Sequence, residues 1–104
     1  TYIHPWMGIA GVDVDLAIAQ DIGLEKPLGF LITYVNSSSP AEEAGLKSGD
    51  VIVGIDGQLV RGLSDLAVYI ERNKRPRDQV TLIIIRNGQQ RLIDLTLGER
   101  PPPT

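Results

Sequence analysis

Apolar residues along this chain gather in short runs that are broken by glycine, proline, asparagine and aspartate. Most runs alternate with polar residues or are rich in valine and isoleucine, which is typical of half-buried or buried strands. Other stretches place apolar residues three and four positions apart, which predicts helices. The pattern predicts strands at residues 6–14, 29–35, 51–55, 58–60, 80–86 and 89–97, and helices at 16–22, 40–44 and 64–73.

The segment from residue 39 to residue 57 predicts a complete unit of helix, turn and strand. Ser39 is suited to cap a helix, and Pro40 fits its first position, where a missing N–H group costs nothing. Gly45 is expected to end that helix in a left-handed conformation. Asp56-Gly57 then predicts a tight turn after the buried strand.

The other helices and the last hairpin carry signals of the same kind. Asp15 is expected to cap the helix at residues 16–22, and Gly23 to close it. Ser64 is expected to be the N-cap of the helix that runs to about residue 73. Asn87-Gly88 between two strand patterns is a strong signal for a two-residue hairpin.

Together these elements predict a small α+β fold that is mostly β: a twisted, mainly antiparallel sheet of five or six strands capped by two main helices. The chain has 104 residues with 42% hydrophobic residues, but only one Trp and one Phe. We therefore expect a core of Val, Ile, Leu and Ala. The length predicts one domain over residues 1–100, followed by a disordered, proline-rich tail at 101–104. Because Thr1 opens the chain, we expect it to be a piece of a longer protein.

The charge pattern argues against nucleic-acid binding. The formal net charge is −3, whereas a nucleic-acid site needs a basic face. The cationic cluster after the third helix is better explained as the complement of the negative helix end. No apolar run is long enough to span a membrane. The cluster consists of Arg72, Lys74, Arg75 and Arg77.

Catalytic and metal chemistry are also disfavoured by the residues present. A Ser-His-Asp system needs a histidine base, and the sole histidine is His4, beside Pro5. The chain has no cysteine, so neither a disulfide nor a thiolate metal site is available. Asp13 and Asp15 are explained by helix capping more simply than by a cation site. We therefore expect no catalytic residue, no metal and no cofactor.

Four segments, in order, resemble PDZ domains, in particular those of HtrA/DegP-type serine proteases. Residues 39–57 resemble the family's core signature, and His4-Pro5-Trp6-Met7-Gly8-Ile9 resembles its carboxylate-binding loop. The helix beginning at Ser64 resembles the helix beside the peptide groove, and residues 80–88 resemble the penultimate strand with its hairpin. The resemblance implies the PDZ fold in the circularly permuted form of bacterial and archaeal protease-linked domains.

The resemblance also implies a peptide site. The amides of Met7, Gly8 and Ile9 would hold a peptide carboxylate, since inward-pointing main-chain N–H groups bind anions. The walls of the groove would be apolar, which implies preference for a C-terminal Val, Leu, Ile, Ala or Phe. For the side chain at position 70, a place in the groove and a place in the core stay equally open. The groove residues implied are Trp6, Ala10, Leu66 and Ile70.

The function implied is capture of hydrophobic C-termini of unfolded or regulatory polypeptides by addition of a β-strand. The implied partners are these peptides and an upstream protease domain in the full-length protein, which would lie outside the cytoplasm, in the periplasm or cell envelope. Two alternatives stay open. One is an assembly module with an occluded groove, which Trp6 itself would fill, and the other is a PDZ domain from another membrane protease or a secretion component.

Overall fold

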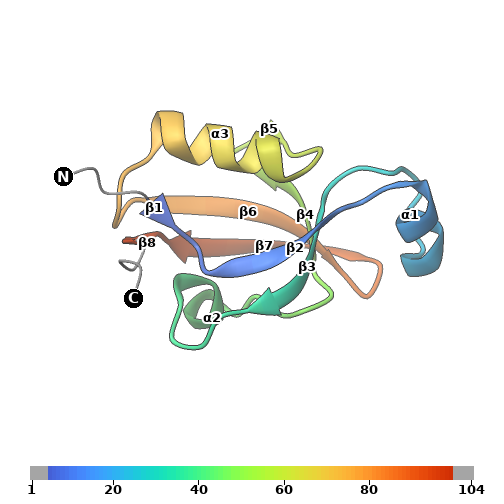
Figure 1. Ribbon diagram of the computed structural model, residues 1–104, viewed down its shortest axis with the longest axis horizontal. Helices are drawn as coiled ribbons and strands as arrows, with labels where there is room; N and C mark the ends of the chain where they lie inside the picture. The colour runs from blue at the N-terminus through green and yellow to red at the C-terminus, as the bar shows by residue number, and fades with distance from the viewer. Residues whose placement is uncertain (1–4, 100–104) are drawn as a thin grey trace.

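The computed structural model describes residues 5–99 as a twisted β-sheet with helices on two sides (Figure 1). The predicted tail at 101–104 and His4 lie outside the described residues. The elements are β1 (Pro5–Trp6), β2 (Ile9–Asp13), α1 (Leu16–Ile22), β3 (Phe30–Val35), α2 (Pro40–Ala44), β4 (Val51–Ile55), β5 (Gln58–Leu59), α3 (Leu63–Asn73), β6 (Gln79–Arg86), β7 (Gln89–Thr96) and β8 (Gly98–Glu99).

The main sheet has the strand order β2-β3-β4-β6-β7, and β5 pairs separately with β4. All of its pairings are antiparallel. A second, two-stranded sheet joins β1 to β8 and so brings the two ends of the described chain together. The predicted mostly-β class with five or six strands and capping helices is confirmed.

The first predicted strand, residues 6–14, is in fact two strands separated by a break at Met7 and Gly8. A second difference lies in β3, where simple alternation predicts Tyr34 on the same side of the strand as Phe30 and Ile32. Ala10 pairs with Tyr34, but the next residue, Gly11, pairs with Ile32, so Thr33 of β3 has no partner in β2 and forms a bulge. A bulge shifts the alternation by one residue, and Tyr34 is 57% exposed.

The two shorter helices have the ends that the sequence predicted. Asp15 caps α1 by accepting the amide hydrogen of Ile18, and Gly23 ends it with φ of +76°. Ser39 caps α2 through the amide of Glu42, and Gly45 ends it with φ of +92°. Both N-caps could be predicted from the sequence because each joins residues only three positions apart.

The start of α3 corrects the sequence prediction. The helix begins at Leu63, and its N-cap is Gly62, which has no side chain to offer. Ser64, the predicted N-cap, lies inside the first turn. The amide of Leu63 is instead capped by the carboxylate of Asp13 from β2, with Oδ1 at 2.7 Å. A cap supplied from 50 residues away leaves no local pattern.

The core lies between the sheet, α2 and α3. It is built from aliphatic residues as predicted, with Phe30 as its one phenylalanine. A smaller cluster of Val14, Ala19 and Val51 seats α1 at the end of the molecule away from β1 and β8 (Figure 1). The fully buried members of the main core include Ile32, Ile52, Ile55, Val60, Leu82 and Ile84.

Candidate peptide-binding site

The loop between β1 and β2 is anchored through its carbonyl groups. The carbonyl of Met7 accepts the amide hydrogen of Ala41 at the start of α2, and the carbonyl of Gly8 accepts that of Asn36, each at 2.9 Å. Gly8 has φ of +87°, a backbone conformation that glycine adopts without a Cβ penalty. The loop is therefore held against α2 and the end of β3.

These anchors fix the direction of the next two amides. In a trans peptide the N–H group points opposite to the preceding carbonyl, and no peptide bond in the described residues is cis. Because the Met7 and Gly8 carbonyls point toward α2 and β3, the N–H groups of Gly8 and Ile9 point away from them. Two adjacent main-chain donors thus lie on the side of the loop that faces away from α2. Such a pair is suited to an anion.

Beyond the loop, β2 carries further unpaired backbone groups. It is the terminal strand of its sheet, so its second edge has no partner strand within residues 5–99. The bonds from Asn36 to Gly8 and from Val14 to Gly29 place Ile9 and Asp13 at positions that do not bond to β3. Gly11, midway between them, shares their direction. Ile9, Gly11 and Asp13 therefore direct their N–H and C=O groups toward the free edge.

The predicted site residues from the two segments meet in part. Met7, Leu66 and Ile70 belong to one buried cluster, with exposed fractions of 6%, 2% and 7%, and Ile9 packs against it half-buried. Ile70, for which core and groove stayed open, is a core residue. Leu66 is more deeply buried and makes no open wall.

Ala10 is exposed, but it does not contribute to the free edge. It pairs with Tyr34, and its neighbours Ile9 and Gly11 alternate with it, so its own backbone groups are directed toward β3. The sequence prediction did not include Gly11, which does belong to the free edge. Alternate residues of a strand direct their backbone groups to the same edge, so Gly11, two residues after Ile9, could have been predicted.

Two helix positions were also missed. On α3, Leu63 and Ala67 share the face of Ile70, at spacings of seven and three residues. Leu63 is 50% exposed, and Ala67 is exposed as well. They are the accessible apolar positions of that face, and the helical spacing from Ile70 was the signal that could have identified them.

Trp6 lies on the other side of the loop. Its ring is 3.3 Å from the place where a Cβ on Gly8 would stand, and the same place is in contact with Ser39. The ring also approaches the corresponding place on Gly98, beside Pro40. The half-buried tryptophan thus packs on the side of α2, away from the direction of the two free donors.

A cluster of charged and polar groups fixes the back of α3. Asp56 accepts from the Tyr69 hydroxyl at 2.8 Å and from the Thr81 amide at 2.8 Å, and pairs with Lys74 at 3.0 Å. Burial raises the pKa of Asp56, but the hydrogen bonds from Thr81, Tyr69 and Lys74 outweigh it and hold the pKa below its usual value. The cluster ties the helix to the β4–β5 turn and to β6.

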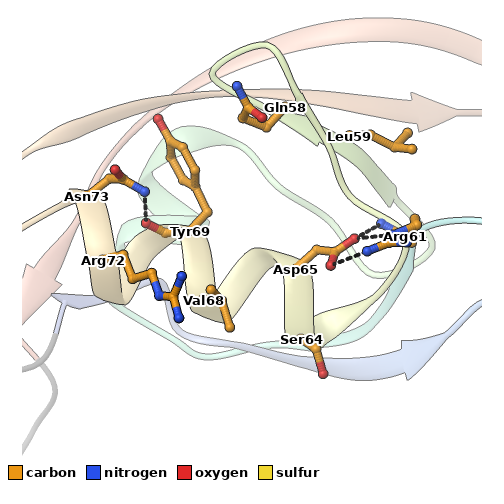
Figure 2. A pocket seen from close by; sticks show the side chains of 9 residues that line it. All are labelled: Gln58, Leu59, Arg61, Ser64, Asp65, Val68, Tyr69, Arg72 and Asn73. Carbon is orange, nitrogen blue, oxygen red and sulfur yellow. Dashed lines mark hydrogen bonds and ion pairs between the residues drawn. The ribbon is translucent and has the colours of Figure 1, made fainter.

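A hollow of about 510 Å³ lies on this back face, between α3 and β5 (Figure 2). None of its lining residues comes from β2 or from the loop at Met7–Ile9, so it is separate from the free edge. Its lining combines apolar side chains with an ion pair between Arg61 and Asp65, in which Nε lies 2.8 Å from Oδ2. The lining residues are Gln58, Leu59, Arg61, Ser64, Asp65, Val68, Tyr69, Arg72 and Asn73.

Two further observations bear on ligands. Within residues 5–99, no three His, Cys, Asp or Glu side chains are grouped so that they could hold a metal ion. In the same residues, no helix is long and apolar enough to cross a bilayer.

A family model described as "PDZ domain" matches residues 5–97. The chain belongs to the PDZ-domain family. This PDZ domain is 38% identical, over 92% of its length, to proteins named "Probable periplasmic serine endoprotease DegP-like" from Halomonas elongata and from a Marinomonas strain. The chain spans only 20% of the length of these relatives. It corresponds to the PDZ part of such a protease and not to its catalytic part.

Solved structures agree with this assignment. The PDZ domain superposes on "HtrA-type protease AlgWS227A with decapeptide" with a TM-score of 0.88 and 29% identity, covering 99% of this chain and 31% of that one. It also superposes on the HtrA3 PDZ domain bound to a phage-derived ligand, with a TM-score of 0.79, covering 95% of this chain and 89% of that one. The latter is 19% identical and supports the fold alone. The predicted membership of the HtrA/DegP type is confirmed.

Proposed function

We propose that this PDZ domain binds the C-terminal residues of polypeptides that end in an apolar side chain. The peptide adds a strand to the free edge of β2, and its carboxylate accepts hydrogen bonds from the loop at Met7–Ile9. The single observation that carries this proposal is the orientation of the Gly8 and Ile9 amides at the start of an unpaired strand edge.

Peptide binding of this kind needs no charged side chain from the domain. Adjacent main-chain N–H donors stabilise the carboxylate through charge-assisted hydrogen bonds. Each hydrogen bond along the edge adds about 0.5–1.5 kcal/mol net. After the cost of ordering the peptide, we expect micromolar affinity, about −8 kcal/mol.

Selectivity would come from the face of α3 and the adjoining core. Leu63, Ala67 and Ile70 present only apolar surface there, and Met7 with its unbranched side chain adapts to different shapes. We therefore expect a C-terminal Val, Leu, Ile, Ala or Phe to be accepted. In the full-length protein, the domain would bring such C-termini to an upstream protease domain. The name of the relatives supports a periplasmic location for that protein.

The test is an NMR titration of the amide signals with two hexapeptides of one sequence that ends in valine. One peptide has a free C-terminal carboxylate, and the other has a C-terminal amide. We expect the free acid to shift the Gly8, Ile9 and Gly11 signals and to bind at least about tenfold more tightly than the amide. Gly23, at the far end of α1, is the internal control.

Two results would contradict the proposal in different ways. Equal affinity for the two peptides would contradict carboxylate binding by the loop, although strand addition at β2 would remain possible. Absence of any shift at millimolar peptide would favour the alternative function, an assembly module whose peptide edge is not used.

A further inference from the structure

The start of α3 depends on a side chain from the strand that the peptide would join. Gly62 at the N-cap position makes no side-chain hydrogen bond. Asp13, the last residue of β2, fills this role with Oδ1 at 2.7 Å from the Leu63 nitrogen. Free N–H groups at a helix start attract negative charge as well as hydrogen-bond acceptors.

Gly62 and Asp13 are fitted to each other. A Cβ on Gly62 would stand 2.7 Å from the Cγ of Asp13 and 2.8 Å from both carboxylate oxygens. The φ angle of Gly62 is −179°, an extended conformation that any residue adopts. Glycine is therefore needed at this position for space and not for backbone freedom. The carboxylate occupies the place of the missing side chain.

This contact joins the two elements that would hold the peptide. Asp13 is the third position, after Ile9 and Gly11, that directs backbone groups to the free edge. Leu63 is the first residue of the apolar face that continues through Ala67 and Ile70. The contact thus links β2 to α3 at the end of β2 that lies opposite the carboxylate-binding loop.

One other contact holds the first turn of α3. Asp65 accepts hydrogen bonds from the main-chain amide of Arg61 at 3.0 Å and from its guanidinium at 2.8 Å, which ties the turn to the loop before it and not to β2. Leu66, at the end of the first turn, and Ile70 seat the helix in the core, and Asp56 fixes its second half through Tyr69 and Lys74. The carbonyl of Arg61 accepts the amide hydrogen of Gly29, which holds the preceding loop to the start of β3. Loss of the Asp13 contact would therefore free the start of α3 from β2 without unfolding the domain.

We propose that Asp13 is a positioning residue for peptide binding: by capping α3 from β2, it sets the distance between the helix face and the free strand edge. This inference rests on the proposed function. It gives a specific consequence, because a strand added to β2 places the last peptide residue beside Ile9, the third from the end beside Gly11 and the fifth from the end beside Asp13. The upstream peptide residues depend on the first turn of α3, and the last ones do not.

The experiment compares Asp13→Ala with Asp15→Ala, in titrations with a hexapeptide and a tripeptide that share a C-terminal valine. Asp15 is the matched control because its carboxylate also caps a helix, with Oδ1 at 2.8 Å from the Ile18 nitrogen, but that helix is α1 and the contact is local. We expect Asp13→Ala to weaken hexapeptide binding about tenfold and tripeptide binding by less than about twofold. We expect Asp15→Ala to leave both affinities within about twofold of the wild type, although both variants lose a helix cap.

Two more variants separate positioning from general destabilisation. Asp13→Asn keeps an oxygen that accepts from the Leu63 amide, and it should retain hexapeptide affinity to within about threefold. Gly62→Ala should displace the carboxylate and reproduce the effect of Asp13→Ala, and it replaces that variant if Asp13→Ala does not fold. Faster hydrogen exchange at the Leu63 amide should accompany the loss of affinity in both.

The outcomes distinguish this inference from the proposed function. A wild-type domain that binds neither peptide would overturn both. A wild-type domain that binds, with Asp13→Ala or Gly62→Ala equal to Asp15→Ala for the hexapeptide, would overturn the role of Asp13 alone. Equal weakening of the hexapeptide and the tripeptide would also overturn it, because that pattern indicates general loss of structure.

Discussion

Substitution of Gly8 by alanine tests the loop on which the proposed function depends. Gly8 has φ of +87°, and a Cβ built there would overlap the Cβ of Ser39 and stand 2.8 Å from its Oγ. Ser39 is fully buried, and its hydroxyl both donates to the Asn36 carbonyl at 2.7 Å and caps α2. It therefore has no alternative position that preserves these bonds.

The expected cost has two parts. An L-residue in the left-handed region costs about 1–2 kcal/mol. Overpacking against a buried group adds about 1–3 kcal/mol. We therefore expect Gly8→Ala to lower the free energy of unfolding by about 2–5 kcal/mol, a large part of the stability of a domain this size. Because the loop moves, peptide affinity should fall too.

Gly57→Ala is the matched control for the stability measurement. Gly57 has φ of +82°, and nothing lies within 4 Å of a Cβ built on it. It should show the backbone cost alone, about 1–2 kcal/mol. The free energy of unfolding of both variants is measured by urea unfolding followed by far-UV circular dichroism. Ser39→Gly removes the overlapping Cβ, so in that background Gly8→Ala should lower the free energy of unfolding by little more than Gly57→Ala does. The reasoning is refuted if Gly8→Ala costs no more than Gly57→Ala, or costs the same in the Ser39→Gly background.

Further predictions concern the anchors of the fold. Arg86 makes two bonds to Asp50, at 2.8 and 2.7 Å, and Asp50 is 1% exposed; Arg86→Met should therefore cost about 3 kcal/mol in urea unfolding, and a loss below about 1 kcal/mol would contradict this. The folded protein lowers the pKa of Asp56 from its ordinary value of 3.8. The ionised side chain should therefore contribute its full stabilisation above pH 3.8, and this stabilisation should be lost as the pH falls through the lower pKa of the folded state. The difference in unfolding free energy between wild type and Asp56→Asn should accordingly be constant near neutral pH and shrink in acid, and a pH-independent difference would count against the cluster.

Local signals explain why most of the fold could be predicted. The caps of α1 and α2 at Asp15 and Ser39 involve residues three apart, and the Asn87-Gly88 turn sits between two strands that pair fully. Such features are encoded within a few neighbouring residues. The family resemblance then supplied the arrangement of the sheet.

The differences arose where a distant contact overrides a local one. Ser64 is a good capping residue, but the N-cap of α3 is Gly62, two residues before it, and the first amide of the helix is capped by Asp13 from β2. Tyr34 continues an alternating pattern, but the bulge before it turns it outward. Neither the bulge nor the cap from β2 can be read from neighbouring residues, because each depends on the pairing of separate strands.

The candidate site was predictable in its loop and less so in its walls. The loop depends on one glycine with a positive φ angle, and Gly8 marks it. On α3, the helical spacing gives an apolar stripe of Leu63, Leu66, Ala67 and Ile70. Leu66 and Ile70, the predicted groove residues, are its buried members. A stripe identifies the face that packs on the core. Leu63 and Ala67 belong to the same stripe but are exposed, and helical spacing alone does not distinguish the exposed members of a stripe from the buried ones.

The loop indicates how folding and the proposed peptide binding would be linked in this domain. The carbonyls of Met7 and Gly8 are fixed by Ala41 and Asn36, and this fixes the opposite N–H groups before any peptide arrives. A peptide would therefore order only itself, which reduces the cost of binding. Because the donors belong to the backbone, side chains on the loop can vary, whereas Gly8 cannot without disturbing Ser39. Changes of ligand preference should arise on α3, and loss of binding should arise where the loop meets α2.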